Sequence, residues 1–315
     1  MQNQISDNAL MPVAPPKLLD VLCPAQAEGA IPAHRMKVWC WGASSADHVV
    51  VCVHGLTRQG RDFDILARRL LERNPRLCIL CPDVVGRGQS DWFPTPSAYQ
   101  IPVYAADVMH WLAARHAEQP ISRLGWVGTS MGGVMGLILA AQPESVRAFP
   151  LHRLVLNDVG PGLPWPFVER LKTYVGVPQV FDSPEQAAAM MRQVSPGFGP
   201  HSDEDWFKLC QPMIKPREAG GWVLHYDPAI AEPIRSLTPE AFAQSEALLW
   251  ALYDQITCPT LVLRGVESDV LLADIAQAMT QRGPRARLIE FSHVGHAPTL
   301  IDPSQTAPVI DWLLN

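Results

Sequence analysis

Short apolar runs alternate along the chain with segments whose apolar positions recur at helical spacing. A continuous apolar run suits a strand of a parallel sheet, because both faces of such a strand are covered. We therefore predict strands at His48–Val53, Leu77–Cys81, Arg123–Val127, Leu154–Leu156, Thr260–Leu263 and Arg287–Phe291.

The segments between these runs have the spacing of helices. In residues 62–73, Phe63, Leu66 and Leu70 fall on one side of a helix. Strands that alternate with helices predict an α/β fold, in which a mostly parallel twisted sheet is flanked by helices on both faces. The other helices predicted for this core are 99–116, 134–142 and 308–314.

Polar residues follow the predicted strands. In sheets of this kind, functional groups gather at the carboxyl ends of the strands. We therefore expect a site built from several of these residues, which the chain order separates widely. They are His54-Gly55, Asp83, Ser130, Asp158, Asp269 and His296.

Ser130 stands in the pattern G-x-S-x-G, between an apolar run and a segment with helical character. A chain that reverses sharply at this serine leaves no room for side chains two residues away, and Gly128 and Gly132 meet that requirement. The helix that follows directs backbone N–H groups at charge that develops there. The pattern predicts that Ser130 is an exposed nucleophile.

Five motifs in order give the chain its resemblance to a known family. They are His54-Gly55-Leu56-Thr57, Gly86-Arg87-Gly88-Gln89-Ser90, Gly128 to Gly133, Arg264-Gly265 through Ser268-Asp269, and Gly295-His296-Ala297-Pro298. Over roughly residues 35–315 the chain resembles the α/β-hydrolase superfamily. Within it, the chain is most similar to cytoplasmic bacterial esterases and to the carbon–carbon bond hydrolases of aromatic degradation.

The resemblance implies a catalytic triad of Ser130, Asp269 and His296. A serine hydroxyl needs a base to take its proton, and histidine is the base whose pKa suits neutral pH. A carboxylate then fixes the tautomer of the imidazole. Asp158 and Glu267 remain alternatives for the acid, because Asp158 ends the preceding strand and Glu267 is a near neighbour of Asp269.

Other polar residues of these motifs have different expected roles. His296 is favoured over His293 as the base, because Gly295 and Ala297 leave its ring room to move. The oxyanion hole is expected to be the backbone N–H groups of Leu56 and Met131. We expect His54 to order the oxyanion loop, Asp83 to be structural and His225 to lie in the lid.

About a hundred residues separate Asp158 from Thr260, whereas a crossover needs only about a dozen. We predict a mostly helical cap, or lid, at 159–256, with helices at 167–174 and 187–194. The core that it covers is formed by 17–158 and 257–315, and a flexible tail at 1–16 precedes the core. The cap is rich in aromatic residues, which predicts an apolar pocket. Candidates for binding substrate are Arg58, Trp165, Trp206 and Trp222.

Composition and charge limit the classes of partner that we expect for this chain. The net charge is −6 and no Lys/Arg cluster appears, so we expect no nucleic acid. No signal sequence and no apolar run of ~18 residues appear, which predicts a cytoplasmic protein without a membrane partner. Cys78 and Cys81 form a C-x-x-C, but a strand points them to opposite faces. We expect no metal and no cofactor.

These features predict a cofactor-independent serine hydrolase of carboxylic esters with small to medium apolar acyl groups. Two alternatives stay open. One is a carbon–carbon bond hydrolase of ring-cleavage diketones, or a lactonase, in which Arg58, Arg170 or Arg192 would bind a substrate carboxylate. The other is a non-catalytic ligand-binding relative. The expected partner is a small ester-like molecule, and the sequence leaves open whether the chain is a monomer or a homodimer.

Overall fold

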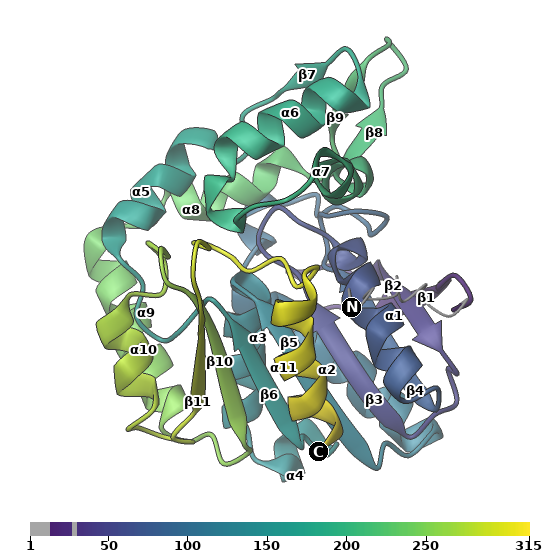
Figure 1. Cartoon of the computed structure of the whole chain (residues 1–315), viewed down its shortest axis with the longest axis vertical. Helices are drawn as coiled ribbons and strands as arrows, with labels where there is room; N and C mark the ends of the chain where they lie inside the picture. Colours follow the sequence, from purple (N-terminus) through teal and green to yellow (C-terminus); the bar gives the residue numbers. More distant parts are fainter. Residues whose placement is uncertain (1–12, 27–29) are drawn as a thin grey trace, which may run out of the picture.

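A computed structural model describes residues 13–26 and 30–315, and an eight-stranded sheet runs through its centre (Figure 1). The strands follow the order β1-β2-β4-β3-β5-β6-β10-β11. From β4 to β11 every neighbouring pair is parallel, whereas β2 is antiparallel to both β1 and β4. Their bounds are β1 Lys17–Cys23, β2 His34–Gly42, β3 His48–Val53, β4 Leu77–Asp83, β5 Arg123–Thr129, β6 Arg153–Asn157, β10 Thr260–Gly265 and β11 Arg287–Phe291.

The mostly parallel sheet confirms the predicted fold class, but the sequence pattern missed β1 and β2. Both strands largely alternate between more exposed and more buried side chains instead of forming continuous apolar runs. This alternation is typical of antiparallel strands near a sheet edge, where one face meets solvent. Of the predicted flexible tail 1–16, residues 1–12 lie outside the described part of the chain, and β1 begins at Lys17.

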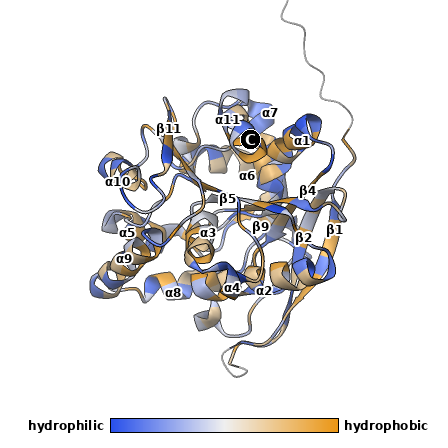
Figure 2. Cartoon of the chain, turned by 90° about the horizontal axis from the view of Figure 1, so that it is seen from below, coloured by the Kyte–Doolittle hydropathy of each residue, from blue (hydrophilic) through white to orange (hydrophobic). Residues whose placement is uncertain are grey.

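Helices cover both faces of the sheet. Figure 2 shows α1 and α11 on one side of the strands and α2 and α3 on the other. Buried apolar residues form a separate cluster under each pair of helices. Residues of α9 and α10 join the apolar cluster of α2 and α3. The helices of these layers are α1 Asp64–Arg73, α2 Ile101–Glu118, α3 Met131–Ala141, the short α4 Glu144–Arg147, α9 Pro239–Tyr253, α10 Ala273–Met279 and α11 Pro303–Leu314.

Strand β3 shows how the core divides between these two faces. Val49, Val51 and Val53 belong to the cluster under α2 and α3, while Val50 and Cys52 belong to the cluster under α1 and α11. Cys78 and Cys81 of β4 are divided between the clusters in the same way. They therefore point to opposite faces, as their spacing in a strand predicts.

An insertion between β6 and β10 forms a lobe at the carboxyl ends of the strands (Figure 1). It adds a small antiparallel sheet, β7-β9-β8, to the predicted helices. Its own apolar cluster is built around Met191, Trp206 and Leu209. We call the elements from α5 to α8 the cap: α5 Trp165–Tyr174, β7 Val180–Phe181, α6 Pro184–Val194, α7 Asp203–Cys210, β8 Ile214–Pro216, β9 Trp222–Leu224 and α8 Glu232–Arg235.

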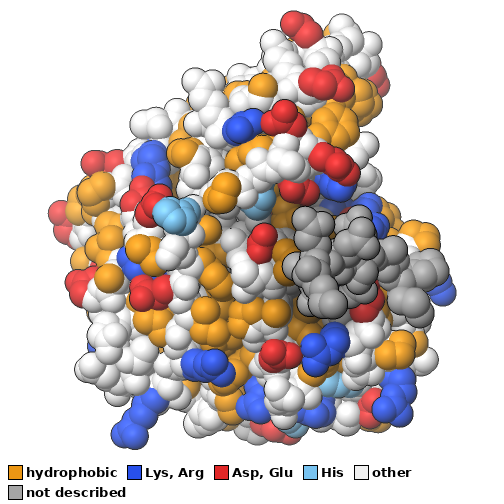
Figure 3. All heavy atoms as spheres, viewed as in Figure 1, with side chains coloured by type: hydrophobic (Ala, Val, Ile, Leu, Met, Phe, Trp, Pro, Cys, Tyr) orange, Lys and Arg blue, Asp and Glu red, His pale blue; other side chains and the backbone are white. Residues whose placement is uncertain are grey.

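Helix α9 follows the cap in sequence but packs against α3 of the core. The predicted range 159–256 therefore contains a helix that belongs to the layer covering the sheet. On the face shown in Figure 3, Lys and Arg side chains are interspersed with Asp and Glu. Among the helices of residues 13–26 and 30–315, none is long and apolar enough to cross a bilayer.

Candidate active site

Ser130 occupies the sharp turn between β5 and α3. Its backbone has φ 52° and ψ −116°, a conformation that side chains rarely adopt. A Cβ atom at Gly128 would lie 2.2 Å from the carbonyl oxygen of Gly132, and one at Gly132 would lie 2.1 Å from that of Val53. The two glycines are therefore required for the chain to turn where it does.

Ser130, His296 and Asp158 form one line of hydrogen bonds. His296 Nε2 lies 3.1 Å from Ser130 Oγ, and His296 Nδ1 lies 2.8 Å from Asp158 Oδ2. Because a carboxylate can only accept, Nδ1 carries the proton of the neutral ring, and Nε2 is left to accept from the serine hydroxyl. This is the geometry that makes a serine nucleophilic.

Asp158 is fully buried at the end of β6 and is held from two sides. Its Oδ1 accepts the Gly265 backbone N–H at 2.9 Å. Its Oδ2 accepts the Ser268 hydroxyl at 2.5 Å in addition to the His296 ring. These bonds satisfy a buried carboxylate and fix its orientation toward the imidazole.

The structure does not bring Asp269, the residue expected to be the acid, into hydrogen-bond contact with His296, and it places Asp158 there. The hydroxyl of Ser268 accepts the N–H groups of Val270 and Leu271 at 3.2 and 3.1 Å and closes a turn around residue 269. The carboxylate of Asp269 is exposed and forms an ion pair with Arg170 of α5. Hydrogen bonding from Arg170 lowers the pKa of Asp269.

The neighbouring candidates are also directed elsewhere. The side chains of Glu267 and His293 are 64% and 85% exposed and lie 4.0 Å apart. Neither is hydrogen-bonded to Ser130, His296 or Asp158 within the described residues. The geometry therefore favours His296 over His293, as the flanking residues predict, and Asp158 over Glu267.

The loop after β3 passes beside Ser130 and is fixed by His54. A Cβ at Gly55 would lie 3.8 Å from Ser130 Cβ. His54 Nε2 accepts the Val84 N–H at 3.0 Å, so its Nδ1–H donates to the Gly55 carbonyl at 2.7 Å. In a trans peptide, the N–H of the same peptide unit, which is that of Leu56, points the opposite way.

The N–H groups of Leu56 and Met131 are free donors. Neither donates to another atom within the part of the chain that the structure describes. Met131 is the first residue of α3, where backbone N–H groups have no partner inside the helix. Burial lowers the pKa of His54 to about 3, so the side chain that holds this loop stays neutral. Two backbone donors that are unpaired within the described residues therefore lie on the segments that adjoin Ser130, one on the loop after β3 and one at the start of α3.

Asp83 ties down the glycine loop that follows β4, as its expected structural role requires. Its carboxylate accepts the N–H groups of Gly60 and Gln89 at 2.8 and 2.9 Å. Burial raises its pKa to about 6 in spite of these hydrogen bonds. Asp83 is not hydrogen-bonded to Ser130 or His296.

The side chains of the candidate substrate-binding residues contact other residues of the protein. Trp206 is buried in the cap cluster, and Trp222 packs against the same cluster. Trp165 lies at the start of α5 with its ring 5.4 Å from that of Phe242. Arg58 donates to Asp62 at 2.6 and 2.7 Å and to the Leu209 carbonyl of the cap at 3.1 Å.

The remaining arginine candidates form ion pairs at the surface. Arg170 pairs with Asp269, and Arg192 pairs with Asp203 at 2.7 Å. Both arginine side chains are about half exposed, at 47% and 57%. Each positive charge already has a carboxylate partner in this structure.

Two cap residues that were not among the candidates contact His296. The Phe167 ring lies edge-on to the imidazole, with centroids 5.7 Å apart. The Gly197 carbonyl accepts the Gly295 N–H at 2.7 Å, and a Cβ at Gly197 would lie 2.8 Å from the His296 backbone. The sequence marks Phe167 only as one of many cap aromatics, so nothing in it distinguishes this contact.

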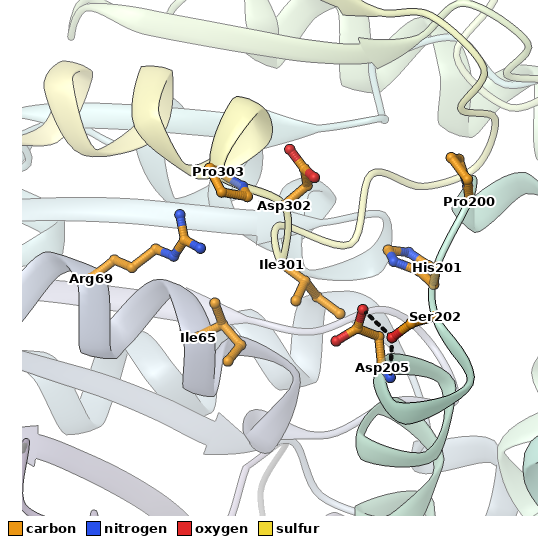
Figure 4. A pocket seen from close by; sticks show the side chains of 9 residues that line it. All are labelled: Ile65, Arg69, Pro200, His201, Ser202, Asp205, Ile301, Asp302 and Pro303. Carbon is orange, nitrogen blue, oxygen red and sulfur yellow. Dashed lines mark hydrogen bonds between the residues drawn. The ribbon is translucent and has the colours of Figure 1, made fainter. Parts of the chain in front are cut away.

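A cavity of about 500 Å³ lies between the cap and the helices α1 and α11. Figure 4 shows Arg69 of α1 and the Ser202–Asp205 end of α7 on opposite sides of it. His201 lines the cavity and contacts Thr299 at 3.1 Å, just beyond the His296 loop. Ser130, Asp158 and His296 are absent from its walls, so this hollow is distinct from the candidate active site.

Cys23, His34 and Asp107 form a buried group whose ligand atoms lie within 4.8 Å of one another. These residue types suit a metal, but hydrogen bonds already occupy His34 and Asp107. His34 contacts the Pro32 carbonyl at 3.0 Å and Asp107 at 3.1 Å, and Gln26 donates to Asp107 at 2.5 Å. The group joins β1 and β2 to α2, elements that contribute nothing to the Ser130 site.

Comparison with known proteins places this geometry in context. The sequence profile of the alpha/beta hydrolase family matches residues 50–311. A 3-hydroxybutyrate-oligomer hydrolase from Cupriavidus necator is 42% identical over 277 residues, which cover 87% of this chain and 91% of that protein. An alpha/beta hydrolase structure from Novosphingobium aromaticivorans is 32% identical with a TM-score of 0.78, covering 96% of this chain and 99% of its own. A hydrolase structure from Rickettsia typhi is 25% identical with a TM-score of 0.81, covering 94% and 98%.

Proposed function

Because the chain belongs to the alpha/beta hydrolase family, we propose that it is a serine hydrolase of carboxylic esters, with Ser130, His296 and Asp158 as its catalytic triad. The observation that carries this proposal is the pair of contacts at His296. Its Nε2 lies 3.1 Å from Ser130 Oγ while its Nδ1 lies 2.8 Å from Asp158.

The reaction begins with attack of Ser130 Oγ on the ester carbonyl carbon while His296 Nε2 takes the hydroxyl proton. The carbonyl oxygen becomes an oxyanion, which accepts the free N–H groups of Leu56 and Met131. The intermediate collapses, the bond to the alcohol breaks, and His296 returns the proton to that alcohol. A water molecule, deprotonated by His296, then releases the acid from the acyl-serine in the same two stages.

We propose short oligomers of 3-hydroxybutyrate as the substrate class. The similarity to the Cupriavidus necator 3-hydroxybutyrate-oligomer hydrolase extends over most of both chains. Such oligomers are carboxylic esters, in which the hydroxyl of one unit is acylated by the next. Both halves of the cleaved bond are small and partly apolar, in keeping with the predicted substrate. The mechanism above supplies the reaction with no cofactor.

A direct test compares the protein with its Ser130→Ala variant on p-nitrophenyl butyrate and on the linear 3-hydroxybutyrate trimer. We expect kcat to fall by roughly 10³-fold or more. Ser245→Ala is a matched control, because that hydroxyl is exposed on α9 and bonds only to the Ala241 carbonyl. Turnover that persists in Ser130→Ala would rule out the serine mechanism.

The same assay separates the alternatives. Lactones and a vinylogous 1,5-diketone, tested beside the esters, decide which bond is cleaved. Rapid hydrolysis of the diketone with poor hydrolysis of the trimer would replace the ester proposal with the carbon–carbon bond hydrolase. Absence of turnover together with absence of labelling by a fluorophosphonate would support the non-catalytic relative.

The cytoplasmic location stays a prediction from the sequence.

A further inference from the structure

Arg87 is a buried cation that the triad leaves unexplained. It lies in the glycine loop after β4, and its side chain is fully buried. None of the ion pairs among residues 13–26 and 30–315 includes it. Its Nη1 donates to the Val85 carbonyl at 2.7 Å, and its guanidinium faces the rings of Tyr104 and Tyr99 at 4.9 and 5.9 Å. Burying a charge without a carboxylate partner is costly, which calls for a reason why it is there.

The guanidinium contacts both residues whose N–H groups form the proposed oxyanion hole. Its Nε donates to the Leu56 carbonyl at 2.8 Å, and its Nη2 lies 3.7 Å from Met131 Sδ. Leu56 is therefore fixed through two adjoining peptides. His54 holds the Gly55 carbonyl on one side, and Arg87 holds the Leu56 carbonyl on the other. This arrangement keeps the Leu56 N–H from turning away.

We infer that Arg87 is a positioning residue for the oxyanion hole. Its side chain fixes Leu56 and supplies positive charge beside the place where the oxyanion forms. The inference rests on the proposed serine mechanism. A fixed cation in a water-poor site stabilises developing negative charge more than it stabilises a neutral ester. The positive charge of Arg87, which has no carboxylate partner within the described residues, is then balanced by the oxyanion in the transition state. This balance lowers the activation free energy.

The same loop is tied to the cap. The Gly88 N–H donates to the His225 carbonyl at 3.0 Å, and the Asp227 N–H donates to the Gly86 carbonyl at 2.7 Å. Arg87 itself forms a β-bridge with Tyr226. The cap segment 225–227 therefore holds the backbone of Arg87 while its side chain holds Leu56, so the cap and the oxyanion loop are joined through one residue.

The test uses Arg87→Met, which keeps the length of the side chain and removes the charge, and Arg87→Lys, which keeps the charge and loses the planar fork. In Arg87→Met we expect kcat for p-nitrophenyl butyrate to fall about 10- to 100-fold while KM changes less than about threefold. The inhibition constant of an alkyl trifluoromethyl ketone, which forms an oxyanion on the serine, should rise by the factor by which kcat/KM falls. Arg87→Lys should lose less.

Arg147→Met is the matched control. Arg147 is buried, donates to the Gln142 carbonyl and lies on α4, at the end of the sheet away from the cap (Figure 1). We expect its kcat to stay within about twofold of the unaltered protein, because it lies far from the oxyanion hole. Thermal unfolding of every variant shows whether it is folded.

Four results would overturn the inference. They are an unchanged kcat in folded Arg87→Met, an equal loss in Arg147→Met, a loss that falls on KM alone, and failure to fold of both Arg87→Met and Arg87→Lys. Failure of both variants to fold would mean that Arg87 is needed for the stability of the fold. If Ser130→Ala abolishes turnover while Arg87→Met does not alter it, the serine mechanism stands and only this inference fails.

Discussion

Replacing Asp158 by Asn tests the assignment of the acid. Oδ1 of Asp158 accepts the Gly265 N–H, so the amide oxygen of Asn should keep that place. The amide NH₂ group would then face His296 Nδ1, where Oδ2 accepts at 2.8 Å. Two donors cannot pair, so the ring would move its proton to Nε2 and direct it at Ser130 Oγ. The imidazole would no longer be a base for the serine.

The wrong tautomer is expected to lower kcat about 10⁴-fold, or about 5 kcal/mol of transition-state free energy. Asp269→Asn should behave differently. Asp269 and Arg170 are 55% and 47% exposed, and an exposed ion pair contributes at most about 1 kcal/mol to stability. Its removal should leave kcat within about twofold, since it touches neither Ser130 nor the Nδ1 side of His296.

Steady-state hydrolysis of p-nitrophenyl butyrate at neutral pH measures both variants, with circular dichroism to check that each is folded. The expected order is the unaltered protein and Asp269→Asn together, with Asp158→Asn far below. A thousandfold loss in Asp269→Asn beside a loss of less than tenfold in Asp158→Asn would refute the reasoning. In that case Asp269 would have to leave Arg170 and reach His296 in the working enzyme.

Two further predictions concern the scaffold of the site. Burial lowers the pKa of His54 from 6.5 to about 3, so the folded state binds a proton at His54 less readily than the unfolded state does. The contribution of His54 to the free energy of unfolding is therefore fully present above pH 6.5 and declines as the pH falls toward 3. Between pH 7 and pH 5 this decline amounts to about 2 kcal/mol. In urea unfolding, the loss of stability of His54→Asn between these pH values should therefore be smaller than that of the unaltered protein by this amount. An equal loss in the two proteins would contradict a buried, neutral His54. Gly132→Ala should lower the free energy of unfolding by about 3 kcal/mol, because its Cβ would lie 2.1 Å from a β3 carbonyl oxygen. Gly55→Ala, whose Cβ has its nearest neighbour at 3.7 Å, should cost much less, and equal urea midpoints would argue against the steric account.

The parts of the site that depend on local backbone sterics could be predicted from the sequence. The glycines around Ser130 are needed for one particular turn, so their spacing identifies that turn and the serine at its apex. A similar reason favours His296, because the small residues Gly295 and Ala297 flank it. Buried parallel strands were also predictable, since each appears as a continuous apolar run.

The acid could not be settled in this way, because three carboxylates, Asp158, Glu267 and Asp269, follow two neighbouring strands. Which one meets the imidazole depends on the turn after β10, where Ser268 bonds to Asp158 and leaves Asp269 exposed. That choice is made by tertiary contacts between residues 110 positions apart. The isolation of Arg87 from carboxylates is likewise visible only when the cap, the glycine loop and the oxyanion loop are seen together.

The most direct test of the whole account is the rate of phosphonylation by a fluorophosphonate, with the modified peptide identified by mass spectrometry. The geometry predicts one adduct per chain, on Ser130, and a rate at least about 10³-fold lower when His296 is replaced by Gln. Modification of a different residue, or undiminished labelling of folded His296→Gln, would contradict the claim that His296 activates the serine.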